Sequence, residues 1–410
     1  MRIRLVMLAL LLSASLVCAA DTDWPQFRGP TGMGVASSSE LPEKWSQTEN
    51  LAWKVEIPGL GNSTPIVWGD RIYLGYHTGR GSGLERHLLA LDRKTGKRIW
   101  DEAVPAKLPE QERIREEHGY TTNSPTVDAD RIYAFFGKTG VFAFNHDGKK
   151  LWQADVGEKL NGWGSAASPI LVGDLVIVNA SVESESLVAL DKKTGEEKWR
   201  LRGIRESWNT PLLVKPTEGE PELILAIFGK VLGIDPKTGK QLWTCDTDIG
   251  WYMVPSVVAH DGIIYCLGGR PGGSLAVKAG GRGDVTKTHR LWTSQKGTNV
   301  PSPVFHEGKL YWMHDNLEMA FRADAKTGTV EYEQRVNRAG GVYASALLAG
   351  GKVYYVTRDG MTYVVRLGAT FDLIAENDLR QRGERFDASP AASGNQLFIR
   401  STKYLYCIGK

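Results

Sequence analysis

The residues best suited to acid–base or metal chemistry form one short run, Glu116-Glu117-His118, followed closely by Tyr120. A carboxylate beside an imidazole can relay a proton or hold a divalent cation. Neighbouring residues in a loop rarely point the same way, however, and paired glutamates are typical of a solvated surface. We therefore assign no catalytic residue and no metal site, and we keep Glu117, His118 and Tyr120 as candidates for ligand or partner binding.

Two other combinations of charged residues could act on a ligand. His314 precedes Asp315 after a β-rich run, so the carboxylate could orient the imidazole, although an aspartate in that position typically caps a turn. Arg322 and Arg358 belong to neighbouring stretches and could face one another as an anion site. Both ideas require the fold to bring the residues together.

Several familiar motifs are excluded. We expect no helix after the glycine-rich stretch 279–285 whose N–H groups would complete a phosphate cradle. The chain contains no nucleophile elbow, no HExxH and no CxxC. Its formal net charge of +3 is spread over 410 residues without a basic stripe, which argues against a nucleic-acid partner.

The elements that position these residues are tandem repeats. The stretch 89–100 (LALDRKTGKRIW) returns at 188–199 (VALDKKTGEEKW) and at 232–243 (LGIDPKTGKQLW), each time with eight residues from Asp to Trp. Alternating apolar residues predict a half-buried strand, and the Asp-x-x-Thr-Gly segment predicts a turn because Asp bonds nearby backbone and Gly accepts a positive φ. Each copy is therefore a strand, a turn and a second strand.

A tryptophan recurs at the same place in most repeats. An indole is a large apolar body with a single N–H to satisfy, so we expect it to wedge between neighbouring repeats. These structural tryptophans are Trp53, Trp100, Trp152, Trp199, Trp243 and Trp292. Some copies depart from the pattern: one replaces the turn by the 279–285 loop, and another has Tyr332 in place of the tryptophan.

Eight copies of a repeat opening predict the architecture. Each is a Ser/Thr-Pro or a variant of it, and the openings recur every 42 to 60 residues or so, in the range of a four-stranded propeller blade. The last copy has sequence for three strands, whereas 51–55 looks like a lone final strand. We expect that strand to complete the last blade and close the ring. The predicted fold is an all-β, eight-bladed propeller of four-stranded antiparallel blades with tryptophan-docking motifs.

The termini divide the chain into three parts. Residues 1–20 combine Arg2 and Arg4, an apolar run and small residues before Asp21, which predicts a signal peptide. Residues 21–50 are rich in Pro, Gly and Ser and predict an extended lead-in, and 51–410 form the propeller. We expect an exported monomer without a transmembrane segment, periplasmic or secreted, and association with the outer membrane is compatible with this. Lipidation at Cys18 stays open because the residue before it is not small.

The loops that enter the innermost strands should surround the mouth of the central channel, and most of them carry an aromatic residue. Such a collar could stack a flat ring or a sugar, or bind a protein. It could equally plug the channel. The candidates for this mouth are Glu117, His118, Tyr120, Trp163, Trp208, Trp251, Tyr252, His314, Asp315, Arg338, Tyr343, Arg358 and Phe386.

The repeat Ala-Leu-Asp-x-x-Thr-Gly-x-x-x-Trp resembles the docking motif of the quinoprotein propellers. That superfamily includes the pyrroloquinoline quinone (PQQ) dependent alcohol dehydrogenases and a non-catalytic branch with the outer-membrane assembly factor BamB. Secreted PQQ-binding-like propeller repeat proteins are similar in the stretch 23–30 (DWPQFRGP) and in the ending 405–408 (LYCI). The paired cysteines of the dehydrogenases are missing here, and in this superfamily the docking motif itself is structural.

These observations favour a non-catalytic exported propeller that serves as a protein-interaction or ligand-binding platform in the cell envelope, with an envelope protein or a small ligand as its partner. No cofactor is assigned. The alternatives are an oxidoreductase, which the resemblance would make PQQ-dependent with calcium, and a carbohydrate-binding propeller.

Overall fold

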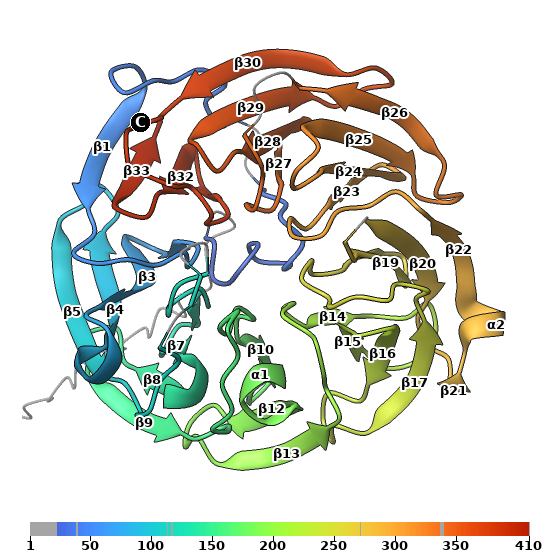
Figure 1. Cartoon of the computed structure of the whole chain (residues 1–410), viewed down its shortest axis with the longest axis horizontal. Helices are drawn as coiled ribbons and strands as arrows, with labels where there is room; N and C mark the ends of the chain where they lie inside the picture. The colour runs from blue at the N-terminus through green and yellow to red at the C-terminus, as the bar shows by residue number, and fades with distance from the viewer. Residues whose placement is uncertain are drawn as a thin grey trace, which may run out of the picture.

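Eight sheets are arranged radially around a central axis in the computed structural model (Figure 1), as the repeats predict, and each is a four-stranded blade, to which blade four adds a short fifth strand. The structure describes residues 23–37, 40–112, 114–115, 118–270, 272–336 and 340–409. Strands follow one another from the axis outward in each blade, and each pairs antiparallel with the next. The predicted all-β, eight-bladed propeller is therefore confirmed.

The first four blades take the chain from residue 66 to residue 246. Their strands are, in blade one, β2 (Ile66–Trp68), β3 (Arg71–Thr78), β4 (Glu85–Asp92) and β5 (Arg98–Pro105); in blade two, β6 (Thr126–Val127), β7 (Ile132–Phe135), β8 (Val141–Phe144) and β9 (Lys150–Ala154); in blade three, β10 (Ile170–Val172), β11 (Leu175–Ala180), β12 (Ser186–Asp191) and β13 (Glu197–Arg202); and in blade four, β14 (Leu212–Val214), β15 (Glu222–Ile227), β16 (Lys230–Ile234) and β17 (Gln241–Asp246).

The remaining four blades follow the same order. Their strands are, in blade five, β18 (Val258–His260), β19 (Ile263–Gly268), β20 (Gly273–Lys278) and β22 (Arg290–Ser294); in blade six, β23 (Val304–His306), β24 (Lys309–Met313), β25 (Met319–Asp324) and β26 (Val330–Arg335); in blade seven, β27 (Leu347–Ala349), β28 (Lys352–Val356), β29 (Met361–Arg366) and β30 (Asp372–Asp378); and in blade eight, β31 (Ala391–Ser393), β32 (Gln396–Arg400), β33 (Tyr404–Ile408) and β1 (Leu51–Glu56).

Helical structure among the described residues is limited to short turns. These are the helices α1 (Ser181–Ser184) and α2 (Thr286–His289) and the 3-10 turns η1 (Gly81–Gly83) and η2 (Gly137–Thr139). The expectation that no helix follows the 279–285 stretch is wrong, since α2 follows it directly, as a single turn of four residues. No helix in the described ranges is long and apolar enough to cross a membrane.

The Asp-x-x-Thr-Gly segment forms the turn between the two outer strands of a blade. In blade one, Asp92 Oδ1 accepts hydrogen bonds from the N–H of Thr95 at 2.8 Å and from its hydroxyl. Gly96 has a φ of +70°, a conformation that costs glycine little. The turn brings the following strand back beside the first, with a bulge between Ala90 and Leu91.

Each docked tryptophan lies on the turn of the next blade. The indole N–H donates to the carbonyl of the residue after the turn aspartate, or after Asn145 in blade two, at 2.8 to 3.1 Å in five cases: Trp53 to Arg93, Trp100 to His146, Trp152 to Lys192, Trp199 to Pro236 and Trp292 to Ala325. A Cβ atom on the turn glycine would lie only 2.4 to 3.0 Å from the ring in all five turns. Only glycine therefore lets the indole approach this closely.

Trp243 differs because blade five has no such turn to receive it. Its indole N–H instead donates to Glu222 Oε2 at 2.7 Å, within its own blade. The 279–285 loop folds over this site, where its short strand β21 (Gly283–Asp284) pairs parallel with β17, and Arg282 forms a 3.1 Å ion pair with Glu222. Trp243 is fully buried as a result. The Arg282-Gly283-Asp284 triplet is thus part of the packing.

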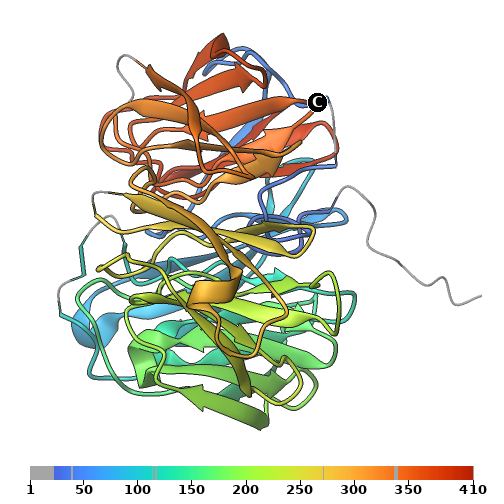
Figure 2. The same cartoon turned by 90° about the vertical axis from the view of Figure 1, so that its right-hand side faces the viewer.

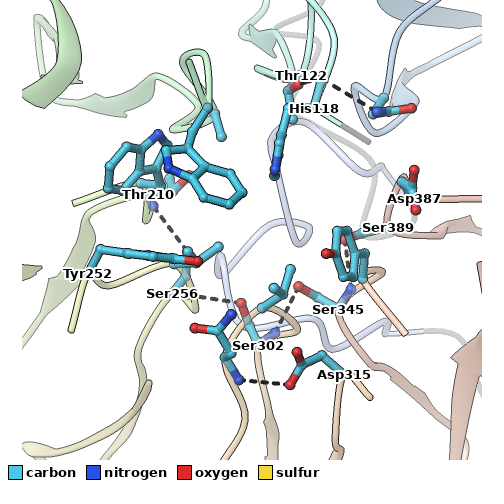
Figure 3. A pocket seen from close by; sticks show the side chains of 18 of the residues that line it. His118, Thr122, Thr210, Tyr252, Ser256, Ser302, Asp315, Ser345, Asp387 and Ser389 are labelled. Atoms are coloured by element: carbon cyan, nitrogen blue, oxygen red, sulfur yellow. Dashed lines mark hydrogen bonds between the residues drawn. The ribbon is translucent and has the colours of Figure 1, made fainter. Parts of the chain in front are cut away.

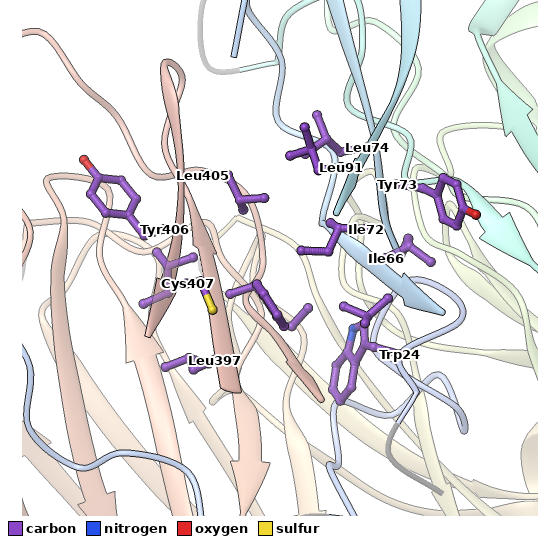
Figure 4. Packing of buried hydrophobic residues seen from close by; sticks show 14 of the residues in the cluster. Trp24, Ile66, Ile72, Tyr73, Leu74, Leu91, Leu397, Leu405, Tyr406 and Cys407 are labelled. Carbon is purple, nitrogen blue, oxygen red and sulfur yellow. The ribbon is translucent and has the colours of Figure 1, made fainter. Parts of the chain in front are cut away.

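The ring closes where β1 pairs antiparallel with β33. Trp53 lies opposite Cys407, and Val55 lies opposite Leu405. Apolar side chains of β32 and β33 then pack toward Ile66 and Ile72 of blade one in a continuous core (Figure 4). The predicted completion of the last blade by the N-terminal strand is correct.

The lead-in crosses the end of the channel at which β2 ends, and Figure 1 shows it in blue across the middle of the ring. Trp24 exchanges two backbone hydrogen bonds with Val67 of blade one, and Leu348 of blade seven exchanges two with Gly34 and Ala36. Arg28 is buried beneath them and donates to the carbonyl oxygens of Met33 and Pro303. The lead-in thus forms a floor across one mouth; the predicted signal peptide lies outside the described residues.

Candidate functional site

The loops from one blade's outer strand to the next blade's inner strand all lie on the face opposite the lead-in, because each inner strand runs from this face toward the other. We call this face the open face. Figure 2 shows the blades from the side. The β2 and β3 turn of blade one and the lead-in share the far face, whereas the loop before Thr64 belongs to the open face.

A belt of hydroxyl side chains from the repeat openings surrounds the channel below the open face. In seven consecutive junctions the N–H of one opening residue donates to the hydroxyl of the next, at 2.8 to 3.1 Å. The belt runs through Thr64, Ser124, Ser168, Thr210, Ser256, Ser302, Ser345 and Ser389. These hydrogen bonds explain why each opening has a small hydroxyl residue, and they link the blades at the axis.

A cavity of about 140 Å³ extends from the open mouth into the belt (Figure 3), where Thr210, Ser256, Ser302, Ser345 and Ser389 line it. Phe27 of the lead-in contributes to its wall and also to the wall of a second cavity on the far side, between the lead-in and blades three to five. The two cavities are therefore neighbours along the channel.

One side of the cavity is a continuous series of rings from different blades. Tyr343 stacks on His118 at 6.4 Å, and His118 meets Trp163 edge-on at 5.2 Å. Tyr252 follows at 5.8 Å from Trp163 and 5.5 Å from Trp208. The Trp208 indole N–H donates to the Gly164 carbonyl, which fixes the orientation of its ring.

Arginine side chains support this aromatic wall. The Arg115 guanidinium lies 4.2 Å from the centre of the Trp163 ring, and the Arg358 guanidinium lies 3.9 Å from that of Tyr343. Arg358 also forms a 2.7 Å ion pair with the buried carboxylate of Asp387, which Arg385 approaches at 3.0 Å. The rings are thus held by charge as well as by packing.

The opposite side of the cavity is polar and is organised by Asp315. This carboxylate is 2% exposed and accepts hydrogen bonds from the Thr298 hydroxyl, the Asn299 N–H and the Asn316 amide. His314 Nδ1 lies 3.2 Å from it. Asn299 Oδ1 is buried and accepts no hydrogen bond from any described residue.

Six of the predicted mouth residues line this cavity together: His118, Trp163, Trp208, Tyr252, Asp315 and Tyr343. Others lie beside it. Trp251 is 38% exposed and contacts Tyr252, and Tyr120 turns toward His77 while its hydroxyl donates to the Gln111 carbonyl. His314 contacts Asp315, and Arg358 contacts Tyr343, but neither His314 nor Arg358 lines the cavity itself. Glu117 and Arg338 lie outside the described residues.

Two expectations about side-chain direction are wrong. Phe386 is fully buried, because its ring packs on Tyr406 and closely approaches Gly360 in the core, so it does not face the mouth. Arg322 and Arg358 do not form a shared anion site, because Arg322 pairs with Glu331 at 2.9 Å inside blade six and Arg358 pairs with Asp387.

Sequence reasoning missed several residues of the cavity. Three of them lie within, or one residue outside, the loops that enter the innermost strands: Arg115, Asn299 and Asp387. Asn316 directly follows the His314-Asp315 pair. Phe27 lies in the lead-in, far from these loops in sequence. Loop membership was an available signal for the first four residues, whereas nothing in the local sequence of Phe27 indicates the channel.

Comparison with known proteins places this geometry in a family. The model of the family described as outer membrane protein assembly factor BamB matches residues 46–210, 91–249 and 228–408. The chain belongs to the BamB family. BamB of Burkholderia pseudomallei is 24% identical over 355 residues, which cover 83% of this chain and 82% of that protein.

Solved structures agree with the family at the level of fold. The crystal structure of BamB from Moraxella catarrhalis matches with a TM-score of 0.64 at 13% identity, covering 88% of this chain and 97% of that one. Quinohemoprotein alcohol dehydrogenase from Comamonas testosteroni matches with a TM-score of 0.67 at 13% identity, covering 96% and 82%. BamB and the quinohemoprotein alcohol dehydrogenase therefore share the propeller fold of this chain.

The described residues of this BamB-family cavity do not fit a calcium-bound quinone. Asp315 is already bonded to three donors and Asp387 to two arginines, so neither carboxylate offers oxygen atoms for a cation. No group of three or more His, Cys, Asp or Glu residues in the described ranges could hold a metal ion. We derive no reaction through such a cofactor.

Proposed function

We propose that this protein is an exported interaction platform that docks another protein of the cell envelope on its open face. The observation that carries the proposal is the distribution of exposed apolar side chains. Six large hydrophobic residues on this face are 38 to 52% exposed: Leu60, Leu108, Leu160, Phe228, Trp251 and Leu317. Apolar and aromatic side chains surrounded by a polar rim are typical of protein interfaces.

The other exposed large hydrophobic residues in the described ranges are scattered. Ile99, Leu151 and Leu291 lie on the outer strands of three different blades, and Leu213 lies in β14. The lead-in already covers the far mouth of the channel. The name of the related family, an outer membrane protein assembly factor, supports a partner in the envelope.

Site-specific photo-crosslinking in the native host tests this proposal. A benzophenone amino acid at Phe228 or Leu317 should give cross-links to a defined envelope protein, and the same probe at Ile99 on the outer rim should not. Cross-links of equal yield at all three positions, or none at any of them, would contradict the open face as a docking surface.

We further propose that residues 1–20 are removed on export and that the mature chain begins near Asp21. The motivation is the charged start, the apolar run and the small residues before Asp21. Mass spectrometry of the protein purified from the host should find this N-terminus. A chain that begins at Met1, or at a lipid-modified Cys18, would contradict it.

A further inference from the structure

We propose that the cavity at the open mouth binds one neutral saccharide ring, between its aromatic wall and its polar wall. This site is separate from the protein-docking role proposed above and does not depend on it. The inference rests on three features of the described residues: the continuous rings, the hydrogen-bonding groups opposite them and the pairing of the carboxylates.

The aromatic wall suits the apolar face of a sugar. Pyranose rings present C–H groups on one face, and these pack on flat side chains that a binding site holds rigid. Trp163 is half-buried and is fixed between Arg115, His118 and Tyr252 at 4.2, 5.2 and 5.8 Å. Its neighbour Trp208 is locked by the hydrogen bond to Gly164. Such rings need no rearrangement to receive a ligand.

The polar wall suits the hydroxyl groups of a sugar. Asp315 orders the backbone of Asn299 and the side chain of Asn316, and all three residues line the cavity. Asn299 is 7% exposed, and hydroxyl side chains of the belt, among them Ser302 and Ser345, line the same cavity. Side-chain amides and hydroxyls donate and accept hydrogen bonds, so they can match the hydroxyl groups of a sugar.

The charges argue against a bare cation as the ligand. Among the described residues that line the cavity, the carboxylates are Asp315 and Asp387 and the cations are Arg115 and Arg270. Asp387 is already paired with Arg358 and Arg385, and Asp315 accepts hydrogen bonds from Thr298, Asn299 and Asn316. A cation would therefore find no free carboxylate, whereas a polyhydroxylated ring needs none.

Calorimetric titration of the full-length mature protein with cellobiose, maltose and N,N′-diacetylchitobiose tests the proposal. At least one disaccharide should bind with a dissociation constant below about 1 mM. Trp163→Ala should weaken that binding at least about tenfold, because truncating one central aromatic anchor usually removes this much. Trp251→Ala is the matched control, since Trp251 is exposed and lies outside the cavity lining, and it should bind as the wild type does.

A second variant keeps the test informative should Trp163→Ala unfold. Asn299→Ala removes a polar side chain of the cavity lining and should also weaken binding, while circular dichroism monitors folding. The proposal would be overturned if none of the three disaccharides binds at a concentration of about 10 mM, ten times the expected upper limit of the dissociation constant. Binding that neither variant weakens, or tighter binding of inorganic phosphate than of every sugar, would also overturn it. The crosslinking result at Phe228 has no bearing on these outcomes.

Discussion

At the scale of single residues, the docked tryptophans combine two requirements that no other side chain meets. The ring must fill the space above a glycine turn, and its edge must donate to a carbonyl oxygen on the neighbouring blade. Phenylalanine would meet only the first requirement. Each docked indole is therefore both a packing element and a hydrogen-bond donor that fixes the distance between blades.

Trp199→Phe separates these two roles. The variant keeps most of the apolar contact but leaves the Pro236 carbonyl without its donor, a loss we expect to lower the free energy of unfolding by about 1 to 3 kcal/mol. Urea denaturation measures this. Trp251→Phe, at an exposed ring, should change stability by less than about 0.5 kcal/mol. Equal stability of the two variants would mean that the indole N–H adds nothing.

A buried carboxyl group makes stability depend on pH. Glu183 in α1 is 2% exposed, and burial raises its pKa to about 7. Since its pKa in the unfolded chain is near 4.5, the folded protein holds the proton longer, and stability should fall by roughly 3 kcal/mol as the pH rises from about 4.5 to about 7.

Glu183→Gln should remove that fall, because the side chain no longer titrates. Denaturation curves at several pH values measure it, with Glu196→Gln at an exposed position as the control that keeps the fall. A pH profile of Glu183→Gln that matches the wild type over this range would count against the buried carboxyl as its origin.

At the scale of elements, the 279–285 loop shows how a blade tolerates the loss of its turn. The loop adds β21 as a fifth strand beside β17 and supplies Arg282 and the Gly280 N–H to Glu222. Glu222 in turn accepts from Trp243. Three contacts thus converge on one carboxylate that replaces the missing turn.

Glu222→Ala should therefore be strongly destabilising, by about 3 to 5 kcal/mol, because it leaves the buried Trp243 N–H and the loop without their acceptor. Differential scanning calorimetry provides the measurement. Glu220→Ala serves as the control, since that side chain is 86% exposed, and it should leave the melting temperature almost unchanged. Similar melting temperatures for both variants would refute the role of Glu222.

The elements also show which features of the molecule could be predicted from the sequence. Strands, turns and the number of blades follow from alternation, Asp-x-x-Thr-Gly segments and repeat spacing, since these are local. The direction of a loop side chain is not local: Phe386 and Tyr343 occupy equivalent loops, yet the first packs against Tyr406 in the core and the second faces the cavity. The partner of Trp243 was equally unpredictable, because it depends on a loop that belongs to another blade.

At the scale of the whole molecule, blade eight differs from the other seven blades. Blade eight alone is built from both ends of the ring, with β1 joined to it only through backbone pairing with β33 and side-chain packing. In every other blade the four main strands come from a continuous stretch of chain. The seam between β1 and β33 is thus the place where the ring can open without unfolding a complete blade.

Hydrogen exchange should reveal that seam. We expect amides of β1 and β33 to exchange at least roughly tenfold faster than those of β12 and β13, because no hairpin joins β1 to β33 as the Asp191–Gly195 turn joins β12 to β13. Trp53→Ala should increase exchange at the seam further, whereas Trp152→Ala, at the equivalent place in blade two, should act on blades two and three. Uniform protection around the ring would contradict a weak seam.

The lead-in places Phe27 in the wall of both cavities, which also share Thr210 and Ser256. The two cavities are therefore neighbours along the channel, with the ring of Phe27 between the lead-in and the blades. A protein docked on the open face would cover the mouth of the first cavity and slow the release of a ligand bound there.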